Sequence, residues 1–348
     1  MHFNMEWDTG DRITLYVVPD GYSAVPSIRV ESGGATILEM TANHRQDALV
    51  AAGRHETGMC GFIFDDGMIP ELSELSDLSV WEPESGLLIY RRPLPEHIRQ
   101  HALHFCTGLI PQRHVDDVLS PYFQYAATRI EAHGHETAMQ LFELHKVESS
   151  FLSGRVLFKN YEVYIEKGVR CFTCLSEPHF AMAERILILA KLAQMPGAEQ
   201  LLGKRDAFMF QAAIEFAASL PLEDGKGLRR AFRSQPPDIA LAFVDPVVRL
   251  LTSTAPNEMA RAGSLAWALD TLASFDAVGI RSHEGDYLNM IAALFGLDPR
   301  AFAPRKTLPK VTALADLLRE EAGVDALIER DLELYNFVEG ALMKCTDR

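Results

Sequence analysis

Apolar positions in residues 11–92 come in short segments separated by turn signals. Several of the segments are rich in β-branched or aromatic side chains, and some alternate between apolar and polar positions. Short strands at this spacing are typical of a small antiparallel β-sandwich. The turn signals are 19–21, 33–34, 65–67 and 84–86, and the predicted strands are 13–18, 27–30, 35–38, 60–64, 78–81 and 87–90.

The pattern changes at Pro93 and Pro95, because paired prolines stop both strands and helices. Residues 96–136 then have apolar positions at helical spacing, which predicts a helical connector. From residue 138 onward, short apolar runs alternate with helical patterns, and this predicts an α/β domain with a parallel sheet and many helices. The predicted domains are therefore 1–92, 93–137 and 138–348.

Two apolar runs of the α/β domain are predicted to be adjacent parallel strands, Met139–His145 and Val169–Leu175. A helical pattern at residues 151–158 lies between them, and a short buried strand is predicted at 276–280. The run 239–244 fits either a further strand or the start of a helix. Ligands of parallel sheets collect at the loops beyond the carboxyl ends of the strands. We therefore expect a site at 146–150 and 176–178.

Composition excludes some classes of function. The 348 residues are 48% hydrophobic and 23% charged, and their formal net charge is −15. Sequence-independent binding to nucleic acid needs a basic surface, so we expect no nucleic-acid partner. No apolar run of 18 or more residues occurs, and the first residues lack a basic start and an apolar stretch. We therefore expect no membrane span, no signal peptide and a cytoplasmic location.

The cysteines and histidines raise the question of a metal. The five cysteines are scattered, which favours reduced thiols over a disulfide framework. Cys171 and Cys174 would point to opposite faces of a strand, so we expect them not to chelate a metal together. His97, His101 and His104 would share one face of a helix, as zinc ligands can. Solvated or hydrogen-bonded histidines explain the same spacing, and we assign no metal site.

Residues 138–337 resemble the sulfotransferases that use 3′-phosphoadenosine-5′-phosphosulfate. In that family a Lys-containing loop closed by small residues holds the 5′-phosphosulfate, and the similar stretch here is 145–150. A later strand of the family ends in Leu-Arg-Asp-Pro, and here it reads 175–178. Ala181 and Glu184 stand where the family has an Arg and a Ser that bind the 3′-phosphate. The segments 275–282, 294–297 and 331–335 are also similar.

The resemblance implies a cofactor and a set of site residues. If the protein is active, the cofactor is 3′-phosphoadenosine-5′-phosphosulfate, whose sulfate is transferred to a polysaccharide hydroxyl. Glu148 departs from the family pattern, because a carboxylate close to a phosphate oxygen costs several kcal/mol at low dielectric. Arg155, Arg185 or the basic residues at 300–310 would have to compensate for the missing phosphate ligands. The implied catalytic residues are His145 and Glu148, and the implied cofactor-binding residues are Lys146, Ser149, Ser150 and Arg185.

The N-terminal segment is similar to an accessory β-domain of bacterial glycosyltransferases and polysaccharide-assembly enzymes. Arg45, Asp47, Gly61 and Phe62 carry the likeness, and Gln46 replaces the usual proline. An ion pair between Arg45 and Asp47 that holds the fold is the simpler interpretation of that pair. The resemblance implies a place in bacterial cell-surface polysaccharide biosynthesis.

Three classes of function follow, and whether the protein is an enzyme stays open. The first is a sulfotransferase-like protein with a degenerate donor site that binds a glycan or polysaccharide-assembly proteins. The second is an active carbohydrate sulfotransferase. The third is a glycosyltransferase-type enzyme, although the Asp-x-Asp signature of metal-dependent sugar-nucleotide chemistry is missing. A homo-oligomer is compatible with each class.

Overall fold

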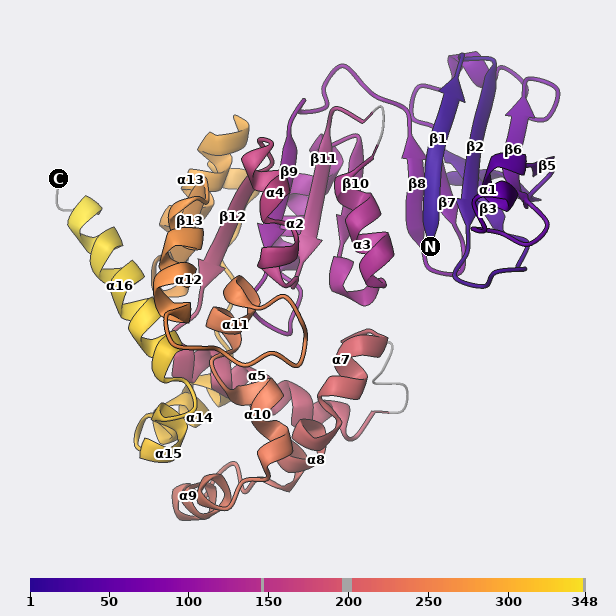
Figure 1. Ribbon diagram of the computed structural model, residues 1–348. Coiled ribbons are helices and arrows are strands. Elements are labelled where there is room, and N and C mark those ends of the chain that lie inside the picture. Colours follow the sequence, from indigo (N-terminus) through magenta and orange to yellow (C-terminus); the bar gives the residue numbers. More distant parts are fainter. Residues whose placement is uncertain (145–146, 196–201, 347–348) are drawn as a thin grey trace. The chain divides into compact units, whose positions relative to one another are not determined.

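The computed structural model describes residues 1–144, 147–195 and 202–346 (Figure 1). Its contacts divide the chain into two compact units. The N-terminal unit comprises Met1–Ala102, Leu119–Thr128 and His133–Leu152, and the C-terminal unit comprises Leu103–Val118, Arg129–Ala132 and Ser153–Arg348. The domain boundaries at residues 92 and 137 stay predictions.

The N-terminal unit contains the predicted antiparallel β-sandwich, built from two four-stranded sheets with orders β1-β2-β6-β5 and β4-β3-β7-β8. All six predicted strands are confirmed, and two strands were missed. The first of these, β1, alternates half-buried and buried positions over residues 2–6, a pattern that polar and charged residues obscure in the sequence. The bounds are β1 His2–Asp8, β2 Arg12–Val18, β3 Ser27–Ser32, β4 Ala35–Thr41, β5 His44–Arg45, α1 Asp47–Ala51, β6 Met59–Asp65, β7 Ser79–Glu82 and β8 Leu87–Arg91.

Buried side chains on alternate strand positions hold the sandwich together. Leu15 lies opposite Met5 on one neighbouring strand and opposite Phe62 on the other. All three side chains are buried. Because side chains alternate between the faces of a strand, one face of β1, β2 and β6 enters the core and the other stays more accessible.

A buried arginine joins several segments of the N-terminal unit. Arg92 Nε donates to Asp8 Oδ2 at 2.8 Å, and its Nη2 donates to Asp8 Oδ1 at 3.0 Å and to Gly10 O at 2.6 Å. The carbonyl oxygens of Leu72 and Leu75 accept from Nη1. Tyr90 Oη also donates to Asp8, at 2.8 Å. The guanidinium is therefore fully paired within its own unit.

Local contacts explain several of the residues in the segment that was compared with the accessory β-domain. Arg45 and Asp47 form an ion pair at 2.8 Å, and both side chains are more than half exposed. Gly58 has φ +77°, and a Cβ there would lie 2.7 Å from Val50 Cγ2. A Cβ at Gly61 would lie 2.8 Å from the carbonyl oxygen of His44. Glycine is thus favoured at Gly58 by its positive φ and the nearby Val50 side chain, and at Gly61 by the close approach of the neighbouring backbone.

The second part of the chain forms a five-stranded sheet with order β10-β11-β9-β12-β13. Hydrogen bonds from Ser150 N to Gln100 O and from Cys106 N to Gly154 O make β11 and β9 parallel. Strand β12 is parallel to β13, with Phe172 opposite Ala277 and Leu175 opposite Ile280. The α/β fold class is therefore confirmed. The strands are β9 His101–Phe105, β10 Tyr125–Thr128, β11 Ser150–Gly154, β12 Arg170–Leu175 and β13 Ala277–Ile280.

Three element predictions around this sheet are wrong. Residues 139–142 of the predicted strand Met139–His145 belong to a helix, α3, in which Thr137, Ala138 and Leu141 are buried at helical spacing, and 143–144 lie beyond its end. Residues 150–154 form β11 rather than the predicted helix, and all five are buried. A strand covered on both faces has no alternation to mark it. For the same reason β9 was hidden in the predicted helical connector.

Helices fill the rest of the chain, and the predicted strands at 169–175 and 276–280 are confirmed as β12 and β13. The run 239–244 is helical in its centre, as α10. Helix α5 packs against α8 and α14, and their buried apolar faces belong to one core cluster (Figure 1). The helices are α2 Arg113–Leu119, α3 His135–Phe142, α4 Glu162–Glu166, α5 Pro178–Leu192, α7 Lys204–Met209, α8 Gln211–Ser219, α9 Gly225–Arg233, α10 Ala240–Phe243, α11 Pro246–Thr252, α12 Ser264–Ala273, α13 Glu284–Phe295, α14 Pro309–Arg319, α15 Ala322–Asp325 and α16 Glu329–Thr346.

Helices α11 and α16 cap each other's N-termini. Asp331, in the first turn of α16, accepts from the backbone N–H groups of Val247 and Val248 at 3.0 and 2.8 Å. Asp245, which precedes α11, accepts from the backbone N–H of Arg330 at 2.9 Å and pairs with its guanidinium at 2.8 Å. The first N–H groups of a helix have no partner inside it. Each helix therefore depends on the other for the hydrogen-bond partners of its first N–H groups.

Candidate functional site

Two arginines of the C-terminal unit come from connections that leave the carboxyl ends of parallel strands. Arg155 directly follows β11, and Arg185 lies in α5, the helix that follows β12. In the sheet, β10 and β11 lie on one side of β9, and the later strands β12 and β13 lie on its other side. Such a change of direction opens a crevice at the carboxyl edge of a parallel sheet, where ligands bind.

The backbone at Arg155 is held by a close approach of a neighbouring loop. Glu131 Oε2 accepts from Arg155 N at 2.9 Å. A Cβ on the preceding Gly154 would lie 2.8 Å from the backbone nitrogen of Ile130, which leaves no room for a side chain. Gly154 therefore allows the contact that positions Arg155 at the end of β11.

The Arg155 side chain is 4% exposed and forms an ion pair with Asp206 in α7. Its Nε has no hydrogen-bond partner among the described residues. The guanidinium carbon lies 5.8 Å from the centre of the Phe210 ring, a distance at which a cation is attracted to an aromatic face. Arg155 is thus partly paired and keeps donor capacity.

A third arginine, Arg249 of α11, is paired with backbone carbonyls. Its Nε donates to Glu258 O and its Nη2 to Pro256 O, both at 2.9 Å. Its Nη1 donates to Leu241 O. These bonds fix the side chain in place but leave its positive charge without a paired carboxylate, because neutral carbonyls do not cancel it. Burial, as the main cause, lowers the pKa of Arg249.

Arg185 is the unpaired group of the set. It is 6% exposed, and no hydrogen bond or ion pair to its guanidinium occurs within residues 1–144, 147–195 and 202–346. Its guanidinium carbon lies 6.0 Å from the centre of the same Phe210 ring that Arg155 approaches. Burial first, and then the nearby Arg155, lowers the pKa of Arg185 to about 9. Arg185 is therefore still charged at pH 7, in a place where its charge is costly.

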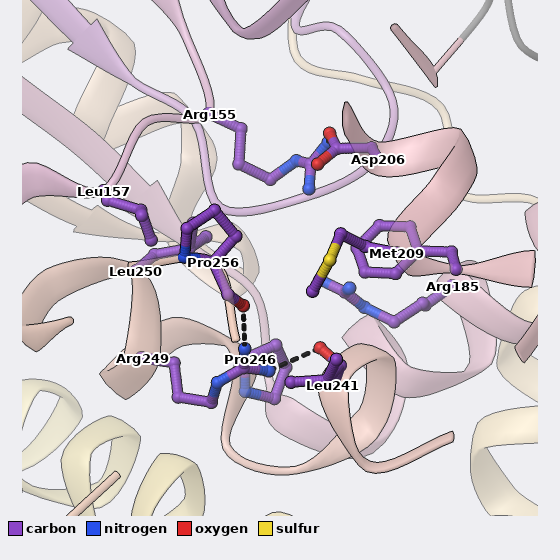
Figure 2. A pocket seen from close by; sticks show the side chains of 11 residues that line it. Arg155, Leu157, Arg185, Asp206, Met209, Leu241, Pro246, Arg249, Leu250 and Pro256 are labelled. Atoms are coloured by element: carbon purple, nitrogen blue, oxygen red, sulfur yellow. Dashed lines mark hydrogen bonds and ion pairs between the residues drawn. The ribbon is translucent and has the colours of Figure 1, made fainter. Parts of the chain in front are cut away.

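The three guanidinium groups line one cavity of about 50 Å³ (Figure 2). The view shows Arg155 beside Asp206, Arg249 tied to Pro256 and Leu241, and Arg185 extending between them. Asp206 is the one carboxylate in the lining, so positive groups outnumber negative ones. A buried charge without a partner is strongly unfavourable, and planar guanidinium groups match the oxygens of sulfate, phosphate or carboxylate. The arrangement is suited to a small oxyanion.

Asp331 lies close enough to favour the charged form of Arg185. However, both of its oxygens already accept backbone N–H groups of α11. Burial raises the pKa of Asp331 to about 7. The carboxyl is therefore partly protonated near neutral pH, and it compensates Arg185 incompletely.

No protein-family model, no curated protein and no solved structure matches this chain. The cavity must therefore be interpreted from its own geometry. In the described part of the chain, no helix is both long and apolar enough to cross a bilayer.

The expected donor loop does not follow a strand. His145 and Lys146 lie outside the described residues. Glu148 is exposed, and Ser149 and Ser150 stand at the amino end of β11, at the other end of that strand from Arg155. Ser149 Oγ accepts from Gln124 N at 3.0 Å, and Ser150 Oγ lies 2.8 Å from His101 Nδ1. Ligand roles for these residues stay predictions.

The positions expected to bind a 3′-phosphate have other contacts. Ala181 lines a small, mainly apolar cavity that also includes Asp331. Glu184 pairs with Arg281 at 2.7 Å, and the Arg281 guanidinium lies 4.5 Å from the centre of the Phe180 ring. Neither position presents a free cation. In the 300–310 segment Arg305 is paired with Glu284 at 3.2 Å, so it does not line the arginine cavity.

Two members of the cavity were not predicted as site residues, namely Arg249 and Asp206. Arg249 follows the run 239–244, which the sequence left undecided between strand and helix, and Asp206 is brought to Arg155 only by tertiary packing. The nearest available signal was the presence of arginine within otherwise apolar helical stretches, at Arg185 and Arg249. A charged residue on a buried helical face requires a partner or a ligand.

The expected placement of His97, His101 and His104 on one helix face is wrong, because His101 and His104 lie in the strand β9. His101 and His104 are three residues apart and therefore point to opposite faces. His104 Nδ1 is 2.7 Å from Asp116 Oδ1 and 3.4 Å from Ser153 Oγ. Both partners share one ring nitrogen and all three side chains are buried, so this is not the relay of a Ser-His-Asp nucleophile. Among the described residues no group of three or more His, Cys, Asp or Glu is arranged to hold a metal.

Proposed function

We propose that this protein binds a sulfate- or phosphate-bearing glycan on a sulfotransferase-like α/β frame, in bacterial cell-surface polysaccharide biosynthesis. The observation that carries the anion part is the convergence of Arg155, Arg185 and Arg249 on one cavity, with Arg185 buried and unpaired among the described residues. The glycan part rests on the resemblance of residues 43–62 to an accessory domain of polysaccharide-assembly enzymes.

The degenerate donor site supports binding rather than transfer. In the resembled family an Arg and a Ser bind the 3′-phosphate, at the positions that correspond here to Ala181 and Glu184. The first lies beside Asp331 and the second is neutralised by Arg281. A charge-assisted hydrogen bond contributes roughly 1.5–3 kcal/mol and about 1.4 kcal/mol is tenfold in affinity, so the loss of both ligands weakens a micromolar site to about the millimolar range.

An active sulfotransferase is the second candidate, and one observation favours it. Arg155 and Arg185 both come from connections at the carboxyl ends of β11 and β12, the edge at which parallel sheets bind nucleotides. In that case the arginine cavity holds the phosphosulfate or the 3′-phosphate in a manner different from the family. The two candidates differ in whether 3′-phosphoadenosine-5′-phosphate binds.

The test compares glucosamine 6-sulfate with glucosamine by calorimetry and by thermal unfolding at constant ionic strength. We expect the sulfated sugar to bind and to stabilise the protein, by about 2.7 kcal/mol at one hundred times its Kd. We expect glucosamine to have no effect, and 3′-phosphoadenosine-5′-phosphate to show no binding below millimolar concentration.

Variants assign the effect to the cavity. Arg185→Met removes the unpaired charge and should abolish the response to sulfate esters. Arg300→Met is the matched control, because Arg300 is 92% exposed and should leave the response unchanged. Inorganic sulfate can serve as a further probe, but it stabilises proteins in general because it is excluded from their surface. For this salt, only the difference in stabilisation between Arg185→Met and Arg300→Met reports binding in the cavity. Equal responses of wild type and Arg185→Met would contradict the proposal. Micromolar binding of the nucleotide that is lost in Arg185→Met would favour the enzyme.

A further inference from the structure

A second cavity of the C-terminal unit lies beside the last strand of the sheet. Its volume is about 240 Å³, compared with about 50 Å³ for the arginine cavity. The end of β13 forms one wall through Gly279 and Ile280, and α13 contributes Met290. The last turns of α16 close another side with Leu342 and Met343. Three elements far apart in sequence therefore surround one space.

The size of this cavity suits a small organic molecule. A water molecule takes about 30 Å³ in the liquid, so the space holds several waters or a compound with one ring. Most of the lining area is apolar. Water in an apolar space gains few hydrogen bonds, and an apolar ligand that displaces it is favoured.

The lining can adapt to a ligand. Met290 is 37% exposed and Met343 is 41% exposed, so both reach the solvent at the cavity. Methionine side chains are flexible and polarizable, and they are common at surfaces that accept varied apolar partners. The wall formed by the end of β13 is more tightly packed. A Cβ at Gly279 would lie 2.5 Å from Tyr287 Cβ, so the tyrosine packs directly on the strand.

The polar groups of the cavity determine which charge a ligand should carry. Among the residues that the structure describes, Asp286 and His283 are the two exposed ionisable residues of the lining, and no described lysine or arginine lines the cavity. No ion pair to Asp286 occurs among the residues that the structure describes. His283 Nδ1 lies 3.1 Å from Ser282 Oγ. The cavity thus combines an apolar interior with an unpaired carboxylate, in a protein of net charge −15.

We infer that this cavity is a binding site for a small apolar amine, with the ring or chain between Met290 and Met343 and the ammonium group at Asp286. Ammonium and carboxylate groups form charge-assisted hydrogen bonds, which are stronger than neutral ones. The site is separate from the arginine cavity in its lining and opposite in its charge preference. It does not depend on the proposed glycan function.

The experiment uses the full chain labelled with ¹³C at the methionine methyl groups. The probe is 2-phenylethylamine, and 2-phenylethanol and phenylacetate are its neutral and anionic analogues. We expect the amine to shift the methyl signals of Met290 and Met343 in a saturable manner. Met259, which is 36% exposed and outside the cavity, serves as the internal control and should not shift. The alcohol should bind several-fold more weakly, and the acid more weakly still.

Two variants decide between specific and adventitious binding. Met290→Trp fills the cavity and should abolish the shift of Met343, while an unchanged Met259 signal shows that the protein is folded. Asp286→Asn should reduce the affinity for the amine to that for the alcohol. The inference is overturned if the amine leaves both methyl signals unchanged, if the three probes bind equally, or if binding persists in Met290→Trp.

Discussion

The two units of this protein each contain a buried arginine, and the two arginines differ in their hydrogen-bond and ion-pair partners. Arg92 in the N-terminal unit donates to both oxygens of Asp8 and to three backbone carbonyls. Arg185 in the C-terminal unit is equally buried and has no such partner among the described residues. A buried guanidinium with all its N–H groups paired is part of the fold. One that lacks partners indicates a ligand that completes it.

The largest expected effect concerns these two residues directly. Arg92→Met leaves the half-buried Asp8 without its cation, and removal of one partner of a buried pair costs up to about 3–5 kcal/mol. Arg185→Met removes an uncompensated charge, so the same substitution should be neutral or stabilising in the absence of an anion.

Urea unfolding can follow the two units separately. In a Trp267→Phe background, fluorescence reports Trp7 and Trp81 of the N-terminal unit, while the far-ultraviolet circular dichroism reports mainly the helices. A large loss of stability in Arg185→Met without ligand would contradict the comparison, because it would show that Arg185 is a structural group like Arg92.

The second effect is a pH dependence at acid pH that the Arg92 cluster has and Arg185 lacks. Burial alone would raise the pKa of Asp8, but hydrogen bonds from Arg92, the Gly10 N–H and Tyr90 lower it below the ordinary value of 3.8. A lowered pKa means that the contribution of Asp8 to stability is complete above about pH 4 and is lost as the pH falls further. Over this acid range Arg185 stays charged, because its pKa of about 9 is far higher.

Urea unfolding of the N-terminal unit at several pH values between 7 and 3 measures this effect. The wild type should lose stability below about pH 4 more steeply than Asp8→Asn, which has no carboxylate to protonate. The two proteins would have parallel profiles if the pairing with Arg92 contributed nothing to the pKa of Asp8.

Some strands could be predicted from the sequence and others could not, because some bury one face and others bury both. The strands of the sandwich bury one face, so Ile13, Leu15 and Val17 alternate with more accessible residues and mark β2 in the sequence. Strands β9 and β11 are covered on both faces and carry Ser153 and His104 inside. Their burial depends on tertiary hydrogen bonds that no local pattern contains.

The same reason applies to the candidate site. Arg185 was named from the sequence as a residue that could compensate for the missing phosphate ligands, and it does line the arginine cavity. Its neighbours Arg249 and Asp206 come from separate helices that only the packing of the C-terminal unit brings together. The expected loop at 145–150 failed as a strand-terminal loop because α3 replaces the strand that was to precede it.

The smallest expected effect tests the exposed ion pair of the N-terminal unit. Arg45 and Asp47 are 61% and 84% exposed, and pairs of this kind contribute about 0–1 kcal/mol. Arg45→Ala should therefore change the unfolding free energy by less than about 1 kcal/mol, whereas Gly58→Ala, at a φ of +77°, should cost about 1–3 kcal/mol. Chemical unfolding of both variants measures the difference. A larger loss in Arg45→Ala than in Gly58→Ala would assign the pair a structural role that its exposure does not predict.

The reciprocal caps of α11 and α16 have a consequence for how the arginine cavity opens. Asp245 and Asp331 tie the start of each helix to the other, so neither helix can fray at that end without leaving N–H groups of its partner unsatisfied. The two helices should therefore detach together, as one unit of local unfolding. Because α11 carries Arg249, the amide hydrogens of Val247, Val248 and Arg330 should exchange at a common rate, and an anion bound in the cavity should slow all of them equally.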